Sequence, residues 1–217
     1  MYTRALQGYE EALGLKHTST LNTIHNLGML YADQGKLAEA EAMYDQALQG
    51  YEEALGPKHI STLTLVCNLG DLYRMQQKLA EAERTTRLAL NGYEETLGPK
   101  HTLTLEAVNN LGRIFADQGK LAEAEPLYIC ALQGYEALES VNVSSYTPAL
   151  KTIFNLGELY SVTERMEMAK GMYSRALSGY TTVQEPSSKW CRQLENQLQA
   201  LQAASAASKA GQDEPNS

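Results

Sequence analysis

The sequence predicts an all-α protein built as a solenoid of repeated helix pairs. An Asn-Leu-Gly triplet recurs at steps of 42, 42 and 45 residues, with its glycine at Gly28, Gly70, Gly112 and Gly157. A tyrosine recurs at the same steps, as Tyr9, Tyr51, Tyr93, Tyr135 and Tyr180. A period of this length indicates an array in which each unit needs its neighbours to bury its apolar face.

Each unit contains two apolar stripes at helical spacing, which predict two helices. In the first full unit the stripes are Leu21, Ile24, Leu27, Leu30 and Tyr31, and then Leu37, Ala40, Met43, Tyr44, Ala47 and Leu48. Gly35 lies between them and can adopt the left-handed conformation that ends a helix. Gly56-Pro57 ends the second helix. At the turn Gly119 repeats the glycine, whereas Gln77 and Glu164 replace it.

Small residues at fixed places predict close contact between the two helices of a pair. The triplet glycines lie in mid-helix, where glycine costs about 1 kcal/mol relative to alanine. We therefore expect neighbours that leave no room for a side chain. The matching place on the second helix is alanine, at Ala40, Ala82, Ala124 and Ala169. Thr86 stands where the other second helices have tyrosine, so we expect the second unit to pack least well.

Composition argues against several classes of function. The formal charge is −8, from 26 acidic and 18 basic residues. This balance argues against binding to nucleic acid or to an anionic membrane, because both need clustered Lys and Arg. No apolar run approaches the roughly 18 residues that span a bilayer. The three cysteines are far apart and form no CxxC motif, which favours a reducing, cytoplasmic compartment.

No arrangement of residues in the sequence predicts catalysis. His17, His59 and His101 recur in the loop before a first helix, about one repeat apart, so they would not converge on one metal ion. A loop or capping role is the favoured interpretation. No glycine-rich phosphate loop is present. We expect no catalytic residues, no metal site, no cofactor and no enzymatic activity.

The repeat resembles a known family. Leu27, Gly28, Tyr31, Ala40, Tyr44 and Ala47 match the tetratricopeptide repeat consensus at their spacing. The 42-residue form, with Asn-Leu-Gly and Leu-Gly-Pro-Lys-His, resembles the repeats of kinesin light chain. It is more similar still to the C-terminal tandem repeats of fungal NB-ARC or NACHT receptor-like proteins. The resemblance implies a right-handed superhelix of antiparallel helix pairs.

The repeat boundaries divide the chain into seven segments. We expect a leading half-repeat, which is the second helix of a truncated unit, four full repeats, a capping helix in which Trp190 packs in the core, and a disordered tail. In that order the segments are residues 1–16, 17–58, 59–100, 101–144, 145–184, 185–207 and 208–217.

The resemblance also implies a peptide-binding groove, because first helices line the concave face in tetratricopeptide proteins. The candidate groove residues carried over in this way are Asn22, His25, Asn26, Met29, Asp33, Thr64, Cys67, Asn68, Asp71, Met75, Glu106, Asn109, Asn110, Arg113, Asp117, Lys151, Phe154, Asn155 and Glu158.

One asparagine per repeat forms a ladder in this set, at Asn26, Asn68, Asn110 and Asn155. An asparagine amide can donate and accept together, so it suits hydrogen bonding to the backbone of an extended peptide. The alternative is that each asparagine fixes the backbone of the neighbouring repeat. Both interpretations stay open.

Charge on the candidate groove favours a neutral or basic ligand. Five carboxylates and two cations give a net charge of −3, with the cations at Arg113 and Lys151. We therefore expect a non-enzymatic protein-interaction scaffold that binds an extended peptide and belongs to a larger signalling or adaptor protein. The alternative is a self-association or autoinhibitory sensor arm of a fungal nucleotide-binding receptor. The sequence leaves the oligomeric state open.

The predicted packing of Ala124 can be tested by substitution. Ala124→Leu should overpack a helix pair and lower the free energy of unfolding by about 1–3 kcal/mol. Glu123→Ala, on the adjacent residue, should be nearly neutral. Thermal melting of the two variants measures the difference, and equal shifts would mean that the predicted helical register is wrong.

Overall fold

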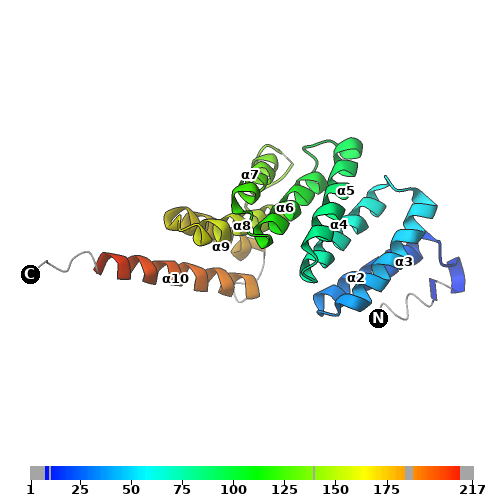
Figure 1. The fold of residues 1–217 in the computed structure, drawn as a ribbon, viewed down its shortest axis with the longest axis horizontal. Helices are drawn as coiled ribbons and strands as arrows, with labels where there is room; N and C mark the ends of the chain where they lie inside the picture. Colours follow the sequence, from blue (N-terminus) through cyan, green and yellow to red (C-terminus); the bar gives the residue numbers. More distant parts are fainter. Residues whose placement is uncertain (1–7, 10, 139, 184–187, 211–217) are drawn as a thin grey trace, which may run out of the picture. The chain divides into compact units, whose positions relative to one another are not determined.

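The computed structural model describes residues 8–9, 11–138, 140–183 and 188–210, and this part of the chain contains helices and turns without β-strands (Figure 1). The helix bounds are α2 Thr18–Asp33, α3 Leu37–Leu55, α4 Ile60–Met75, α5 Leu79–Leu97, α6 Thr102–Asp117, α7 Leu121–Glu136, α8 Thr147–Val162, α9 Met166–Val183 and α10 Lys189–Ala210. None of these helices is both long and apolar enough to cross a lipid bilayer.

The chain forms two compact units, which are residues 1–120 (the N-terminal unit) and 121–217 (the C-terminal unit). The predicted half-repeat lies partly outside the described residues, because these exclude 1–7 and 10. Helix α10 begins at Lys189 and continues past residue 207 to Ala210. The rest of the predicted tail, 211–217, also lies outside the described residues.

The two helices of the first pair are in direct contact at Gly28, one of the predicted glycines, and also at Gly50, for which no contact was predicted. A Cβ atom added to Gly28 would lie 2.5 Å from Cε1 of Tyr44, and one added to Gly50 would overlap Cδ2 of Leu21. Gly28 lies on α2 and Gly50 on α3, so the two helices approach each other closely at two places. These separations are too short for any side chain, which is why the helices tolerate the propensity cost of glycine.

Thr86 is fully buried in the second pair, α4/α5, at 0% exposure. A Cβ atom on Gly70 would overlap the Thr86 hydroxyl oxygen, so this pair also stays in close contact. The substitution of tyrosine by threonine instead leaves a buried hydroxyl group that has no hydrogen-bond partner among the described residues. Such a group carries a desolvation cost of about 1–3 kcal/mol.

The turns between paired helices adopt the left-handed conformation that the sequence predicted. Gly35 and Gly119 have φ angles of 73° and 76°. Gln77 and Glu164 occupy the same place with φ angles of 61° and 59°. The backbone geometry is therefore kept where the glycine is lost, at the steric cost that an L-residue meets in this region.

The recurring histidines are N-caps of the first helices, in agreement with the predicted capping role. The Nδ1 atom of His17 accepts a hydrogen bond from the backbone N–H of Ser19 at 3.2 Å, and His59 accepts one from Ser61 at 3.1 Å. His101 caps α6 in the same way, accepting from Leu103 at 3.2 Å. Each cap satisfies one of the donors that a helix N-terminus leaves unpaired.

A glutamine just after α4 and another just after α6 join each of these helices to the second helix that precedes it. Nε2 of Gln76 donates to the backbone oxygen of Leu37 at 3.4 Å and to Glu41 at 2.8 Å. Gln118 repeats this contact toward α5, where it donates to Glu83 at 3.0 Å. These bonds therefore join successive repeats within the N-terminal unit, whose helices α3 to α6 are labelled in Figure 1.

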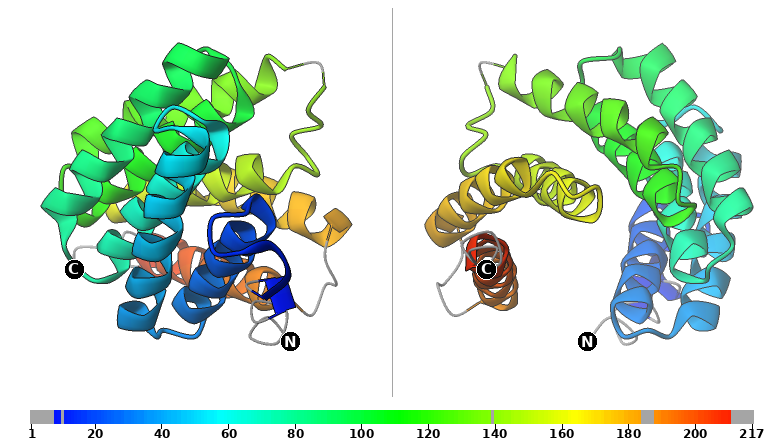
Figure 2. Two further views of the ribbon diagram at one scale, coloured as in Figure 1. Left: turned by 90° about the vertical axis from the view of Figure 1, so that its right-hand side faces the viewer. Right: turned by 60° about the vertical axis from the view of Figure 1, so that its left-hand side comes forward.

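The C-terminal unit packs helix α10 alongside α9 (Figure 2). The ring of Trp190 stacks on Tyr180 at 5.7 Å between centroids and meets Phe154 edge-on at 5.4 Å. Trp190 thus packs against the core of this unit. Arg165, just before α9, makes two hydrogen bonds of 2.7 and 2.8 Å to the carboxylate of Glu125.

The left-handed turn predicts a stabilising substitution. Gln77→Gly should raise the free energy of unfolding by about 0.5–1 kcal/mol, because relief of the left-handed strain exceeds the loss of chain entropy that glycine brings. Gln34→Gly is the matched control, since Gln34 has a φ angle of −83° in the same kind of turn and gains no relief. Urea denaturation should move the two midpoints in opposite directions, and equal shifts would contradict the strain argument.

Candidate functional site

Helices α2, α4 and α6 of the N-terminal unit are joined by side-chain hydrogen bonds between successive first helices. Nδ2 of Asn68 lies 2.8 Å from Nε2 of His25, and Nδ2 of Asn110 lies 3.5 Å from the sulfur of Cys67. We call the surface that carries these residues the first-helix face. The predicted groove residues that lie on these three helices are Asn22, His25, Asn26, Met29, Asp33, Thr64, Cys67, Asn68, Asp71, Met75, Glu106, Asn109, Asn110, Arg113 and Asp117.

Two members of the asparagine ladder in this unit contact side chains of the preceding first helix rather than its backbone. Asn68 and Asn110 each direct their NH2 group to the residue just before the asparagine of the preceding first helix. The two amide oxygens accept no hydrogen bond within the described part of the chain, so both keep an acceptor for a ligand. Asn26, at the first place of the ladder, is exposed.

Two buried tyrosines hold polar side chains of the first-helix face in place. The hydroxyl group of Tyr51 donates to Oδ1 of Asn22, and the hydroxyl group of Tyr93 donates to Oγ1 of Thr64 at 2.9 Å. Both tyrosines are 1% exposed and reach the face from the second helix of the pair. Buried tyrosines of the second helices therefore hold these two polar side chains in position.

A network of ion pairs connects α4 with α6. Nε of Arg74 bonds to Asp71 at 2.8 Å, and its Nη1 bonds to Asp117 at 2.8 Å. Arg113 lies 3.2 Å from the same Asp71 carboxylate. The side chain of Arg74 is 18% exposed, so this guanidinium group is held by the two carboxylates and not offered freely to a ligand.

The remaining predicted residues of the N-terminal unit differ in accessibility. Met29 is 44% exposed and Met75 is 38% exposed, so both offer apolar surface beside the amides. Glu106 is half-buried. Asn109 is only 7% exposed, and its burial removes it from the surface that a ligand could contact.

The predicted residues of the fourth repeat belong to α8 in the C-terminal unit. Lys151 is exposed, and Asn155 is half-buried. Glu158 accepts a hydrogen bond from the hydroxyl group of Tyr173 at 2.5 Å. Phe154 is 8% exposed and contacts Trp190, so it packs under α10.

Burial shifts the pKa values of side chains on the first-helix face and in the core beneath it. It lowers the pKa of His25 below the usual value of 6.5, and the neutral ring matches a role as acceptor from Asn68. Burial raises the pKa of the Cys67 thiol to about 12, so the thiol stays protonated and unreactive. Burial, with the nearby carboxylates of Asp71 and Asp33, raises the pKa of Tyr44 to about 12.

Arg74 is the functional candidate that the sequence analysis missed. The same position is Ala32 in the first repeat and Ala116 in the third, so the second copy alone in the N-terminal unit carries a charge there. This difference between the repeats is visible in the sequence and could have identified Arg74. Among the described residues, no group of three or more His, Cys, Asp or Glu side chains could hold a metal ion.

The repeats of this chain match a known family model. The family model described as "Tetratricopeptide repeat" matches residues 1–53, 19–95 and 67–137. A search of curated proteins found no match.

Several solved structures share the fold. BtubC (BKLC) from P. vanneervenii is 22% identical, with a TM-score of 0.73 over 94% of this chain and 82% of that one. A putative kinesin light chain from Podosopora anserina, with nearly identical TPR-like repeats, is 19% identical, with a TM-score of 0.60 over 85% of this chain and 86% of that one. A substituted variant of that fungal protein is 18% identical, with a TM-score of 0.67 over 89% of this chain and 90% of the variant.

The lowered pKa of His25 predicts a pH-dependent stability. The folded state holds the ring neutral, so the unfolded state binds more protons below the unfolded pKa near 6.5. The contribution of His25 is fully present above that pH and is lost as the pH falls below it. The urea midpoint of the wild type should therefore fall more between about pH 7.5 and about pH 5 than that of His25→Gln. Parallel pH profiles would contradict this assignment.

Proposed function

Because the chain belongs to the tetratricopeptide repeat family, whose repeats generally form scaffolds for protein–protein interaction, we propose that it binds an extended peptide segment along the first-helix face. The observation that carries the proposal is the pair of asparagine amides on adjacent helices. Asn68 and Asn110 are oriented by bonds through their NH2 groups, which leaves each amide oxygen as an acceptor.

Orientation by the scaffold favours binding. A side chain that is already held in one position loses little conformational entropy when a ligand binds. The bonds to His25 and Cys67 therefore prepare the two amide oxygens to accept backbone N–H groups of a peptide. Exposed Met29 and Met75 add flexible apolar surface, which accommodates different peptide side chains.

Charge on the first-helix face supports a neutral or basic segment as ligand. Four carboxylates and two guanidinium groups give a net charge of −2, from Asp33, Asp71, Glu106, Asp117, Arg74 and Arg113. Both guanidinium groups contact Asp71, so neither is a free cation for an acidic peptide. Like-charge contacts would weaken the binding of acidic sequences.

The test uses linear peptides selected against the wild-type chain from a displayed random library. Asn26→Ala removes an exposed amide that has no hydrogen bond within the described part of the chain, so stability should not change. The Kd should rise about 3- to 10-fold, which corresponds to one hydrogen bond. Asn68→Ala should raise the Kd and also lower the free energy of unfolding by about 0.5–1.5 kcal/mol.

Gln46→Ala is the matched control, because Gln46 is an exposed residue on α3 outside this face. Its Kd and stability should equal those of the wild type. Titration at low salt should also show tighter binding of a basic peptide than of its charge-reversed counterpart. The proposal is wrong if Asn26→Ala and Asn68→Ala leave binding unchanged, or if the acidic peptide binds more tightly.

A further inference from the structure

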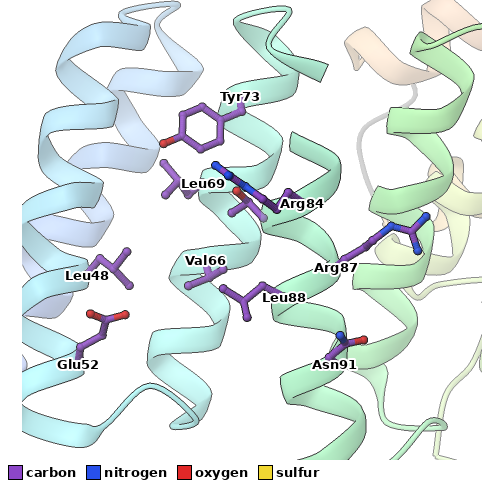
Figure 3. Close-up of a pocket in the computed structure, with 10 residues that line it drawn as sticks. Leu48, Glu52, Val66, Leu69, Tyr73, Arg84, Arg87, Leu88 and Asn91 are labelled. Atoms are coloured by element: carbon purple, nitrogen blue, oxygen red, sulfur yellow. The ribbon is translucent and has the colours of Figure 1, made fainter. Parts of the chain in front are cut away.

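A pocket of about 510 Å³ opens between the second helices α3 and α5, with α4 as its floor. Val66 and Leu69 of α4 form an apolar floor beside Tyr73, and Leu48 of α3 and Leu88 of α5 stand on either side (Figure 3). We call this the α3–α5 pocket. Leu88 is 62% exposed, so its side chain stands largely in solvent at the edge of the recess.

The pocket lies on a different side of α4 from the first-helix face. Val66, Leu69 and Tyr73 follow one another at helical spacing and line the pocket. Asn68 and Asp71 lie on the first-helix face. A molecule in the pocket would therefore leave the proposed peptide site open.

The rim of the pocket departs from the other copies of the repeat. Leu88 occupies the position of Gln46, Cys130 and Arg175 in the other repeats. Arg84 occupies the position of Ala42, Pro126 and Gly171. The second repeat thus places a large apolar side chain and a cation on the outer side of α5, where its neighbours have small or polar residues.

The rim carries opposite charges on its two walls. Glu52 of α3 and Arg84 of α5 are both exposed, and Figure 3 shows them on opposite sides of the recess. Arg87, a second lining cation, makes hydrogen bonds of 3.1 and 3.0 Å to Glu83 and lies 5.4 Å from the Phe115 ring centroid. Arg84 makes no ion pair within the described part of the chain, so it is the lining cation that can pair with a carboxylate of a partner.

We propose that the α3–α5 pocket is a two-fold contact with a second copy of this chain. Such a contact places the same patch on both subunits, so each group meets its counterpart across the axis. A copy turned by 180° over the pocket brings its Arg84 to Glu52 and its Glu52 to Arg84. Each exposed Leu88 then covers the apolar floor of the other copy, which removes it from water.

This occupant fits better than an unrelated peptide, because the pocket contains every group that its partner must supply. The surface needs a large apolar side chain, a carboxylate for Arg84 and a cation for Glu52. It presents Leu88, Glu52 and Arg84 itself. A contact of this small size predicts reversible association and not a permanent dimer.

Sedimentation of the purified chain over about 10 µM to about 1 mM tests the contact. The weight-average mass of the wild type should rise from 23.9 kDa toward twice that value. Leu88→Gln, which installs the residue of the first repeat, should stay at 23.9 kDa with unchanged helical content. Leu30→Gln is the matched control, since Leu30 is an exposed leucine outside the pocket, and it should associate like the wild type.

Charge-reversing substitutions of Arg84 and Glu52 test whether these residues pair across the axis. Arg84→Glu and Glu52→Arg should each be monomeric alone, because like charges would face each other across the axis. An equimolar mixture should associate again, since both cross-axis pairs are then attractive. A wild type that remains monomeric, association that survives Leu88→Gln, or a mixture that stays monomeric would each overturn the proposal, and the first result would leave the pocket to a ligand of another kind.

Discussion

Close contact between the two helices of a pair is the constraint on which the rest of this structure depends. At Gly28 and Gly50 a single added carbon would overlap a side chain of the partner helix. That contact fixes the register of the pair. It also places Tyr51 so that its hydroxyl group reaches through the core to Asn22. In the next pair Tyr93 reaches Thr64 in the same way, so the same packing holds a different polar side chain in position.

Much of the fold could be read from the sequence because its determinants are local and repeat along the chain. A glycine at a turn, a histidine before a first helix and an alanine at a crossing each act within one unit, and the period reveals them. The role of Asn68 could not be settled in that way. Whether an amide faces a ligand or the preceding helix depends on a residue of another repeat, here His25, and the repeat pattern contains both possibilities.

Residues that differ between repeats identify surface features that the repeat period alone does not predict. Arg74 stands where the first and third repeats have alanine, and Arg84 stands where the first repeat has alanine, yet the structure gives the two arginines different surroundings. Arg74 is held between two carboxylates on the first-helix face, whereas Arg84 lines an outer recess. Both arginines belong to the second repeat, in which Thr86 also replaces a tyrosine. The second pair accepts the change at Thr86 because Gly70 still contacts this smaller side chain, so the two helices stay in close contact.

The glutamine contact between successive pairs has a consequence for how such a chain can change in length. Gln76 meets Glu41, and Gln118 meets Glu83, so the two joints use the same residue types. Loss of one whole unit by unequal recombination between similar coding segments would bring Gln118 to Glu41 and recreate a joint that already exists. Duplication of a unit would do the same. An array with interchangeable joints can therefore be lengthened or shortened in evolution without any new interface having to arise.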